Sequence, residues 1–414
     1  MKTFQSIRGM SDSLPPTTSW WQKLETILQT TAASYGYQEI RFPLLEFTDL
    51  FVRTIGDTTD IVEKEMYTFK DRNEDSITLR PEGTACCVRA GIQHGLLHNQ
   101  IQRLWYLGPM FRHERPQKGR LRQFHQFGVE AFGLAGPEID AEILLLGQRI
   151  FSALNVQDHL VLQINSLGSA ASRKLYREKL VAYFNTHTAQ LDDESRIRLR
   201  HNPLRILDSK NPQLTEVIKN APKLLDYLDD DARQHFAGLL KLLEQLGIKY
   251  EINPCLVRGL DYYNLTVFEW VTNALGAQGA VCAGGHYDGL VEQLGGKATP
   301  AIGFALGLER LLELARAHIQ TETTPQIYVI ADDVTAAFDL AEKIRLALPE
   351  LRVTMNCESG DMRLQLRRAD KSGAKIAVMQ ESSSETLKIK FLRERLAEQN
   401  LKRDDLITKL QELF

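Results

Sequence analysis

The residues from Phe111 to Glu130, FRHERPQKGRLRQFHQFGVE, combine cationic side chains with a predicted turn. Five cations fall within eleven residues, against the single acid Glu114: Arg112, Arg115, Lys118, Arg120 and Arg122. Pro116 and Gly119 favour a turn, and the β-prone residues on either side predict a hairpin with the cations at its tip. A charge run is often only a solvated loop, but arginines held on a hairpin suit a ligand that carries phosphate.

The strand that leaves this hairpin carries further polar side chains. Positions 126, 128 and 130 share one face because side chains alternate along a strand, so Gln126 and Glu130 point the same way. Gln123 and His125 precede them. A basic hairpin that continues into a polar strand predicts a site for a phosphate-bearing substrate beside a second, small polar substrate.

Two arginines outside this segment lie among apolar residues. Arg258 is in LVRGLDYYNLTVFEW (256–270), and Arg310 lies in IGFALGLERLL (302–312), where small residues on a strand lead into a helix. Burying a guanidinium is costly unless a carboxylate or a phosphate meets it. Arg258 therefore either forms a structural ion pair with Asp261 or faces an anionic substrate, and Arg310 is expected to be buried against an anion.

Two shorter segments are candidates for the same site. In LRPEGTA (79–85), Glu82 and Thr84 have the same parity and could face one pocket, with a simple turn as the alternative. The glycine-rich AGGHYDGLVEQLGG (283–296) lacks the G-x-G-x-x-G spacing of a dinucleotide-binding turn. Its glycines instead suit a backbone that a ligand approaches closely.

The elements around these segments predict an antiparallel sheet with flanking helices. Apolar residues at helical spacing predict a helix from about residue 17 that stops at Gly36. Pro43 breaks the β-prone QEIRFPLLE and marks an edge or an interface. Short β-prone runs between about 65 and 133 predict hairpins, with a helix from Thr84 to Leu97 between them, and a long helix is expected from Pro137 to about Leu154.

The rest of the chain predicts an insertion and a second domain. Residues from about 165 to 250 are rich in leucine and charged residues, which predicts a helical insertion within a domain spanning 1–320. The polar TETTP (321–325) predicts a linker, and alternating strands and helices after it predict a small α/β domain with a mainly parallel sheet over 326–414. The expected fold class is thus α+β, with an α/β domain at the C-terminal end.

Composition narrows the class of protein. The 414 residues indicate more than one domain, and the net charge of −3 means that any nucleic-acid contact must be a local patch. The five cysteines contain no C-x-x-C pair, so neither a zinc site nor a disulfide framework is predicted, and no metal site built from protein side chains is expected. Without an apolar signal core or a run of ~18 apolar residues, a cytoplasmic protein with no membrane contact is expected.

Together these segments resemble histidyl-tRNA synthetases over essentially the whole chain. YGYQEIRFPLLE resembles class II motif 1, with Pro43 as its signature residue, FRHE…FHQFGVE resembles motif 2, and GFALGLERLL resembles motif 3. LVRGLDYYN and AGGHYDGLV are similar to the two histidine-specific signatures, which are far more specific. The resemblance implies a class II synthetase fold, an antiparallel sheet flanked by helices, in a homodimer joined through motif 1, with a C-terminal domain that binds the anticodon.

The resemblance also implies an activity, in which L-histidine is activated by ATP, accompanied by Mg²⁺, and joined to the 3′ end of tRNA(His). The implied catalytic residues are Arg112 and Arg258, on opposite sides of the α-phosphate. The implied histidine ligands, with Glu130 and Tyr263 at the imidazole, are Glu82, Thr84, Arg112, Gln126, Glu130, Arg258, Tyr262 and Tyr263. The implied ATP ligands are Arg112, Glu114, Arg120 and Arg310. The candidate tRNA contacts are Arg115, Gln117, Lys118 and Arg122 on the hairpin, and Arg363, Arg367 and Lys371 on one face of a C-terminal helix, for which a solvated face is the alternative.

Two positions depart from the family signatures. His286 stands where arginine is usual, and Leu265 where arginine is frequent. Two rival functions follow from the same resemblance: a regulatory paralogue that serves the ATP phosphoribosyltransferase of histidine biosynthesis, and a class II synthetase for another amino acid such as proline, threonine or glycine. Such paralogues generally lack the C-terminal domain and lose the arginines that this chain keeps, and LVRGLDYYN argues against the second rival.

Overall fold

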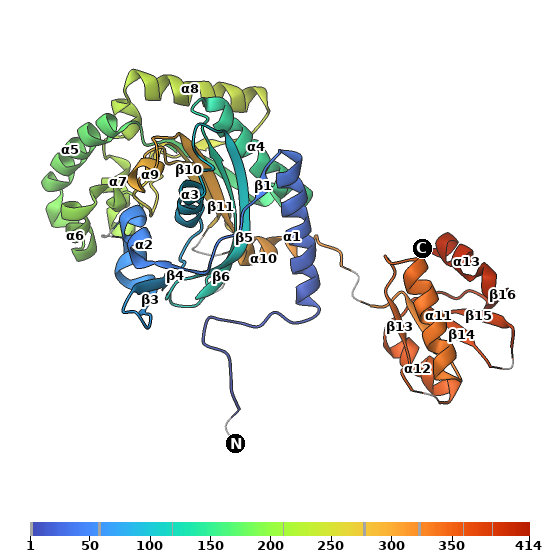
Figure 1. The fold of residues 1–414 in the computed structure, drawn as a ribbon. Coiled ribbons are helices and arrows are strands. Elements are labelled where there is room, and N and C mark those ends of the chain that lie inside the picture. Colours follow the sequence, from blue (N-terminus) through green and yellow to red (C-terminus); the bar gives the residue numbers. More distant parts are fainter. Residues whose placement is uncertain are drawn as a thin grey trace. The chain divides into compact units, whose positions relative to one another are not determined.

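The computed structural model describes residues 3–56, 59–117, 119–209, 211–275, 279–321, 324–358, 360–382 and 384–414. The chain divides into two compact units, Met1–Gln320 and Thr321–Phe414. Figure 1 shows the sheet and helices of each unit.

The first unit is built around a sheet of eight strands in the order β1-β5-β6-β11-β10-β9-β7-β8. The strands are β1 (Gln38–Glu39), β5 (Gln102–Phe111), β6 (Gln123–Phe132), β7 (Val161–Ser166), β8 (Glu251–Ile252), β9 (Asn264–Val271), β10 (Ala280–His286) and β11 (Ala301–Gly307). The six inner strands run antiparallel to one another, and the two-residue edge strands β1 and β8 pair in parallel. The predicted antiparallel sheet and the β5–β6 hairpin are confirmed.

Helices cover both faces of this sheet. On one face, apolar side chains of the strands pack against α1 (Thr17–Ser34), α4 (Pro137–Ala153), α8 (Asp230–Gln245) and α10 (Leu308–Ala315). The other face packs against α3 (Thr84–Gln93) and α9 (Leu290–Gln293), and α2 (Thr48–Ile55) packs on α3. Because β6 is covered on both sides, its residues from Phe127 to Phe132 are buried without interruption. The predicted ends of α1 and α4 are confirmed, and Gly36 takes a positive φ of 80° just after α1.

A small sheet with the strand order β2-β4-β3 is formed by the residues between β1 and β5, and it has an apolar face. Its strands are β2 (Leu45–Phe47), β3 (Tyr67–Lys70) and β4 (Ser76–Leu79). Phe47, Ile77 and Phe69 are aligned across the three strands. Phe47 is 63% exposed and Phe69 47% exposed. Large aromatic side chains that remain exposed in register are typical of a surface that another chain covers.

The segment predicted to be a helical insertion is helical. It contains α5 (Ala170–Thr186), α6 (Asp193–His201) and α7 (Thr215–Lys219), which with intervening 3-10 turns enclose a core of their own around Tyr176 and Phe184. The helix that follows, α8, differs because its residues Phe236, Leu239 and Leu243 belong to the main core beside α4.

The second unit is a five-stranded sheet, order β13-β12-β14-β15-β16, with three helices. Its elements are β12 (Ile327–Ala331), α11 (Val334–Ala347), β13 (Val353–Met355), α12 (Met362–Lys371), β14 (Ile376–Gln380), β15 (Thr386–Phe391), β16 (Gln399–Lys402) and α13 (Leu406–Leu413). The first three strands are parallel, as predicted, whereas β15 and β16 add an antiparallel edge that the sequence analysis did not identify.

None of the helices in the described part of the chain is both long and apolar enough to span a bilayer. All five cysteines are unpaired, and Cys86, Cys87 and Cys282 are buried.

Candidate active site

A cavity of about 270 Å³ lies against the inner strands of the large sheet. It gathers side chains from segments that are far apart in sequence: Glu82, Thr84, Arg112, Glu114, Arg120, Gln126, Arg258, Tyr262, Tyr263 and Arg310. These are all the predicted histidine and ATP ligands except Glu130, which lies behind the wall and accepts a hydrogen bond from Thr84.

Glu82 caps the N-terminus of α3 at one end of the cavity. Its carboxylate accepts hydrogen bonds from the backbone N–H groups of Thr84 and Ala85, each at 2.8 Å. These N–H groups belong to the first turn of the helix, where no backbone partner is available. Burial raises the pKa of Glu82, while the same two N–H groups act in the opposite direction. LRPEGTA is therefore a capped helix start, and the alternative of a simple turn is wrong.

Glu130 is a buried carboxyl held by three hydroxyl groups. Its Oε1 accepts from Thr84 at 2.7 Å and from Tyr106 at 3.3 Å, and its Oε2 accepts from Tyr287 at 2.5 Å. Burial raises the pKa of Glu130 to about 8, although the hydrogen bonds from Tyr287 and Thr84 lower it. The carboxyl is thus oriented for a ligand that supplies a further N–H.

Tyr106 and Tyr287 were not among the predicted site residues. Tyr106 reaches Glu130 because it lies opposite Gly128, where a Cβ atom would come within 2.1 Å of the Tyr106 ring. Tyr287 follows directly on β10 in AGGHYDG, the glycine-rich segment that had been linked to a ligand only through its backbone. Both tyrosines are visible in the sequence, but neither could be linked to Glu130, which is 24 positions from Tyr106 and 157 positions from Tyr287.

Gln126 lines the cavity with an unsatisfied acceptor. Its Oε1 atom is buried and has no hydrogen-bond partner among the described residues. A buried acceptor without a donor costs roughly 1–3 kcal/mol. The position therefore favours a ligand that donates a hydrogen bond.

Arginines surround the other end of the cavity. The guanidinium of Arg112 donates from Nε to Pro81 O at 2.9 Å and lies 5.3 Å from the centre of the Phe124 ring. Arg310 donates from Nε to Gly119 O at 2.9 Å and from Nη1 to Ala280 O at 2.5 Å. Burial lowers the pKa of Arg310, and the neighbouring charges of Arg120 and Arg112 lower it further. Mutually repelling cations of this kind are stabilised when an anion enters.

Arg258 approaches the cavity from the segment before β9. It forms an ion pair with Glu269 rather than with Asp261, so the predicted alternative of an Arg258–Asp261 pair is wrong. The Asp261 carboxylate accepts a hydrogen bond from Asn202 at 3.1 Å instead. The Arg258 guanidinium also lies 5.6 Å from the centre of the Tyr263 ring, which places both side chains in one wall of the cavity.

A family model described as histidyl-tRNA synthetase matches residues 9–311. The chain belongs to the histidyl-tRNA synthetase family. The structure of apo S. aureus histidyl-tRNA synthetase is 33% identical, with a TM-score of 0.82 over 98% of this chain and 99% of that chain.

Two more distant structures share the fold of this histidyl-tRNA synthetase family member. Histidyl-tRNA synthetase from Nostoc sp. PCC 7120 is 19% identical, with a TM-score of 0.70 over 99% of this chain and 100% of that chain. A Bacillus halodurans C protein described as an ATP phosphoribosyltransferase regulatory subunit/histidyl-tRNA synthetase is 20% identical, with a TM-score of 0.65 over 93% of this chain and 100% of that chain. At this identity the likeness concerns the fold alone.

The candidate tRNA contacts of this family member lie on two elements. Arg115, Gln117 and Arg122 are in the connection between β5 and β6, and Lys118 lies outside the described residues. The connection is tied back by a hydrogen bond from Arg122 Nε to Glu114 O at 3.2 Å. Arg363, Arg367 and Lys371 are exposed along α12, while Gln365 and Ala369 face the core of the second unit.

The two departures from the family signatures do not line the cavity. Leu265 has a positive φ of 44° at the start of β9, where its N–H donates to Gly168 O at 3.1 Å. His286 is fully buried at the end of β10. Neither residue reaches the groups that would touch a substrate there.

Proposed function

We propose that this protein is an active histidine–tRNA ligase, which converts L-histidine and ATP to histidyl-adenylate and then transfers histidine to the 3′ end of tRNA(His). The single observation that carries the proposal is the composition of the cavity. One end is backed by the buried Glu130 carboxyl, and the other is surrounded by Arg112, Arg120 and Arg310. An imidazole suits the first end, and a triphosphate suits the second.

The histidine end would recognise its substrate through paired polar groups. Glu130 accepts an imidazole N–H, and the Tyr263 phenol addresses the other ring nitrogen. Glu82, Thr84 and the unsatisfied Gln126 Oε1 face the ammonium group, which has three N–H bonds to donate. An amino acid without an imidazole leaves these buried groups unpaired, which is the physical basis of selectivity.

The arginines would stabilise the adenylation step. The histidine carboxylate attacks the α-phosphorus, and pyrophosphate leaves as the new phosphorus–oxygen bond forms. Negative charge grows on the α-phosphate oxygens, and Arg112 and Arg258, which both line the cavity, would neutralise it. Arg120 and Arg310 hold the leaving phosphates. The Glu114 and Glu309 carboxylates border the cavity and suit the Mg²⁺ that accompanies ATP, whose charge neutralises phosphate oxygens.

Transfer to tRNA would involve both units. The β5–β6 connection, with Arg115, Gln117, Lys118 and Arg122, meets the acceptor end, and exposed Arg363, Arg367 and Lys371 on α12 meet the anticodon side. Lysine and arginine contacts of this kind bind phosphates and position the nucleic acid.

The apolar face of the β2-β4-β3 sheet serves as the homodimer interface, where the exposed Phe47 and Phe69 would be buried. The unpaired cysteines suit the reducing cytoplasm in which translation takes place.

The test is amino-acid-dependent exchange between ATP and pyrophosphate, followed by charging of tRNA(His). Histidine-dependent exchange together with charging is the expected result. A regulatory paralogue would fail both assays, and a synthetase for another amino acid would show exchange with that amino acid in place of histidine. Arg112, Arg258 and Arg310 around the cavity, together with the folded second unit, favour the ligase over the paralogue.

A further inference from the structure

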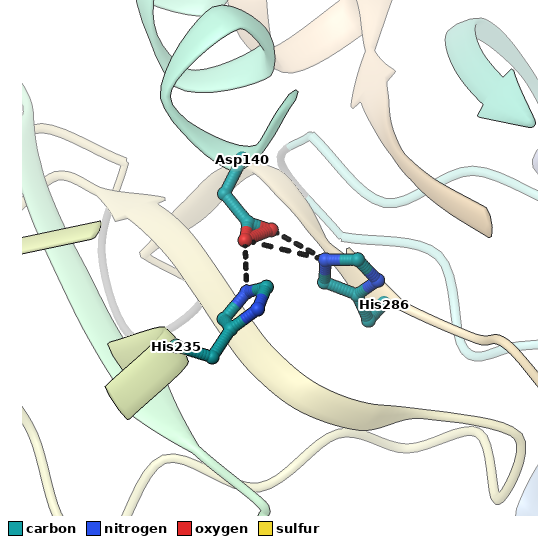
Figure 2. Close-up of side chains that lie close together, drawn as sticks. All are labelled: Asp140, His235 and His286. Carbon is teal, nitrogen blue, oxygen red and sulfur yellow. Dashed lines mark hydrogen bonds and ion pairs between the residues drawn. The ribbon is translucent and has the colours of Figure 1, made fainter. Parts of the chain in front are cut away.

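A second group of chemically versatile side chains, Asp140, His235 and His286, meets away from the cavity. Figure 2 shows the three side chains converging from α4, α8 and the end of β10. One ligand atom from each lies within 4.8 Å of the others. Asp140 and His286 are fully buried, and the His235 side chain is 11% exposed. His235 and His286 are 95 and 146 residues from Asp140, so the group could not be predicted from a local sequence motif.

Both imidazoles point Nε2 at the same carboxylate. His235 Nε2 is 2.5 Å from Asp140 Oδ2, and His286 Nε2 is 2.5 Å from Asp140 Oδ1 and 3.2 Å from Oδ2. The contact to Oδ1 is not aligned as a hydrogen bond, so this buried oxygen has no donor among the described residues. A metal cation would satisfy Oδ1, because it binds directly to an oxygen lone pair and needs no N–H group pointing at that oxygen.

The surroundings orient the ligands. His286 Nδ1 is 3.1 Å from Asp288 Oδ1, and Asp288 is fixed by hydrogen bonds from Asn264 Nδ2 and Ala301 N, each at 2.9 Å. A histidine whose Nδ1–H is given to a carboxylate presents its Nε2 lone pair, which is the arrangement usual for metal-binding histidines. Asp140 lies in the first turn of α4. Pro137 at the start of the same helix packs against Gly238 of α8, where a Cβ atom would come within 3.0 Å of the proline ring.

We propose that Asp140, His235 and His286 bind one Zn²⁺ ion that clamps α4, α8 and β10 together. Two imidazole nitrogens and one carboxylate oxygen are ligands that Zn²⁺ accepts at about 2.0–2.2 Å, with water in the fourth position on the side where His235 is partly exposed. Tetrahedral bonds of that length place neighbouring ligand atoms about 3.3 Å apart. Each nitrogen therefore needs to move away from its nearest Asp140 oxygen by less than about 1 Å. The two nitrogens, which lie within 4.8 Å of one another, must also come to about 3.3 Å apart for the ion to enter.

The position of the clamp links it to the active site. Tyr287, the residue after His286, donates its hydroxyl to Glu130 at 2.5 Å. Fixing His286 therefore fixes the residue that orients the proposed imidazole ligand. The same ion would hold α8, the helix that follows the helical insertion, against α4 of the main core. This role is structural, because none of the three side chains lines the cavity.

The proposal is tested on the full-length protein, stripped with a chelator and titrated with ZnCl₂. Bound zinc is measured by elemental analysis and thermal stability by calorimetry. We expect about one Zn²⁺ per chain and a melting temperature that rises by roughly 2–4 °C at saturation. Crystals soaked in ZnCl₂ are expected to show an anomalous peak between the three ligand atoms. The absence of stoichiometric binding overturns the proposal and identifies the group as an imidazolium–carboxylate pair held by protons alone.

Three variants and a control locate the binding. His235→Gln keeps a hydrogen-bond donor near Asp140, and His286→Arg keeps a cation between Asp140 and Asp288, but neither substitute offers an imidazole lone pair. Both are expected to lose the zinc-dependent rise in melting temperature. Asp288→Asn is expected to weaken zinc binding by roughly tenfold or more. His201→Gln, at an exposed histidine ending α6, should bind zinc as the wild type does. Undiminished zinc binding by folded His235→Gln or His286→Arg overturns the proposal.

Discussion

Thr84 donates a 2.7 Å hydrogen bond to Oε1 of Glu130 across 46 positions of the chain. This bond ties the first turn of α3 to the C-terminal part of β6. Glu82 accepts from the backbone of the same turn, at Thr84 N and Ala85 N. The proposed ligands of the histidine ammonium group and of its imidazole are therefore one connected assembly, and a change at either end is expected to affect both.

Glu130→Gln is predicted to reduce histidine activation by roughly 2 kcal/mol or more, which is about 30-fold in kcat/KM, because a buried acceptor for the imidazole is mispaired. Pyrophosphate exchange over a range of histidine concentrations measures the loss. Activation within twofold of the wild type would show that Glu130 does not contact the substrate.

The difference in stability between the wild type and Glu130→Gln is also predicted to depend on pH. Because burial raises the pKa of Glu130 from 4.5 to about 8, the folded protein retains a proton that the unfolded chain has released between those values. The stabilising effect of that proton is complete below pH 4.5 and is lost as pH rises through about 8. The wild type should therefore lose stability relative to Glu130→Gln between pH 5 and pH 8, as measured by urea unfolding at several pH values.

Gly303→Ala is predicted to disable histidine activation without touching a substrate. Gly303 pairs with Glu130 across β11 and β6, and a Cβ atom there would lie 1.8 Å from Glu130 Oε2. The carboxyl must move away from Tyr287 and Thr84 to make room. Gly289→Ala is the control, because a Cβ atom at that exposed glycine would meet no other atom within 4 Å. Equal exchange rates in the two variants would contradict the placement of Glu130.

Arg258→Ala is predicted to slow adenylation by on the order of a hundredfold or more while changing histidine affinity much less, because charge on the α-phosphate develops in the transition state. Single-turnover adenylate formation separates the rate from the affinity. Arg316→Ala, on an arginine whose side chain is 56% exposed, is the control and should retain the wild-type rate. A large loss of histidine affinity at an unchanged rate would indicate a binding role for Arg258 instead.

Phe47→Asp is predicted to dissociate the proposed homodimer, because a carboxylate replaces an aromatic side chain that would be buried between two chains. Phe47 and Phe69 face the same side of the small sheet, so Phe69→Asp should have the same effect. Ile197→Asp, at an isoleucine 62% exposed on α6, is the control. Sedimentation velocity gives the oligomeric state. A dimer that survives in both phenylalanine variants would place the interface elsewhere.

The sequence predicted the parts of this structure whose signals are local. The β5–β6 hairpin follows from alternating residues around Pro116 and Gly119, and α4 begins at Pro137, as expected from helix-start preferences. Partners brought together by the sheet could not be predicted in this way. Glu269 is the partner of Arg258, whereas only Asp261, which is nearer in sequence, had been predicted as a possible partner. Tyr106 and Tyr287 reach Glu130 only because β5, β6 and β10 lie in one sheet. The order of strands in that sheet cannot be derived from the spacing of these residues in the sequence.

Removal of the second unit is predicted to separate the two half-reactions. The chain should be cut after Gln320, because Ile319 still packs in the main core. All the side chains that line the cavity precede this point, so the shortened protein should still make histidyl-adenylate from histidine and ATP.

Charging of tRNA by the shortened protein should fall much further than exchange, because the exposed cations of α12 are lost, and phosphate contacts supply much of the affinity for nucleic acid. The residual charging should rely on Arg115 and Arg122 of the β5–β6 connection. It should also depend less steeply on salt than in the intact protein, since fewer phosphates are neutralised. The measurement is pyrophosphate exchange and tRNA charging on one protein across a salt series. Equal losses in both assays, with the dimer intact, would mean that the second unit supports the active site directly, and the division of labour proposed for the two units would be wrong.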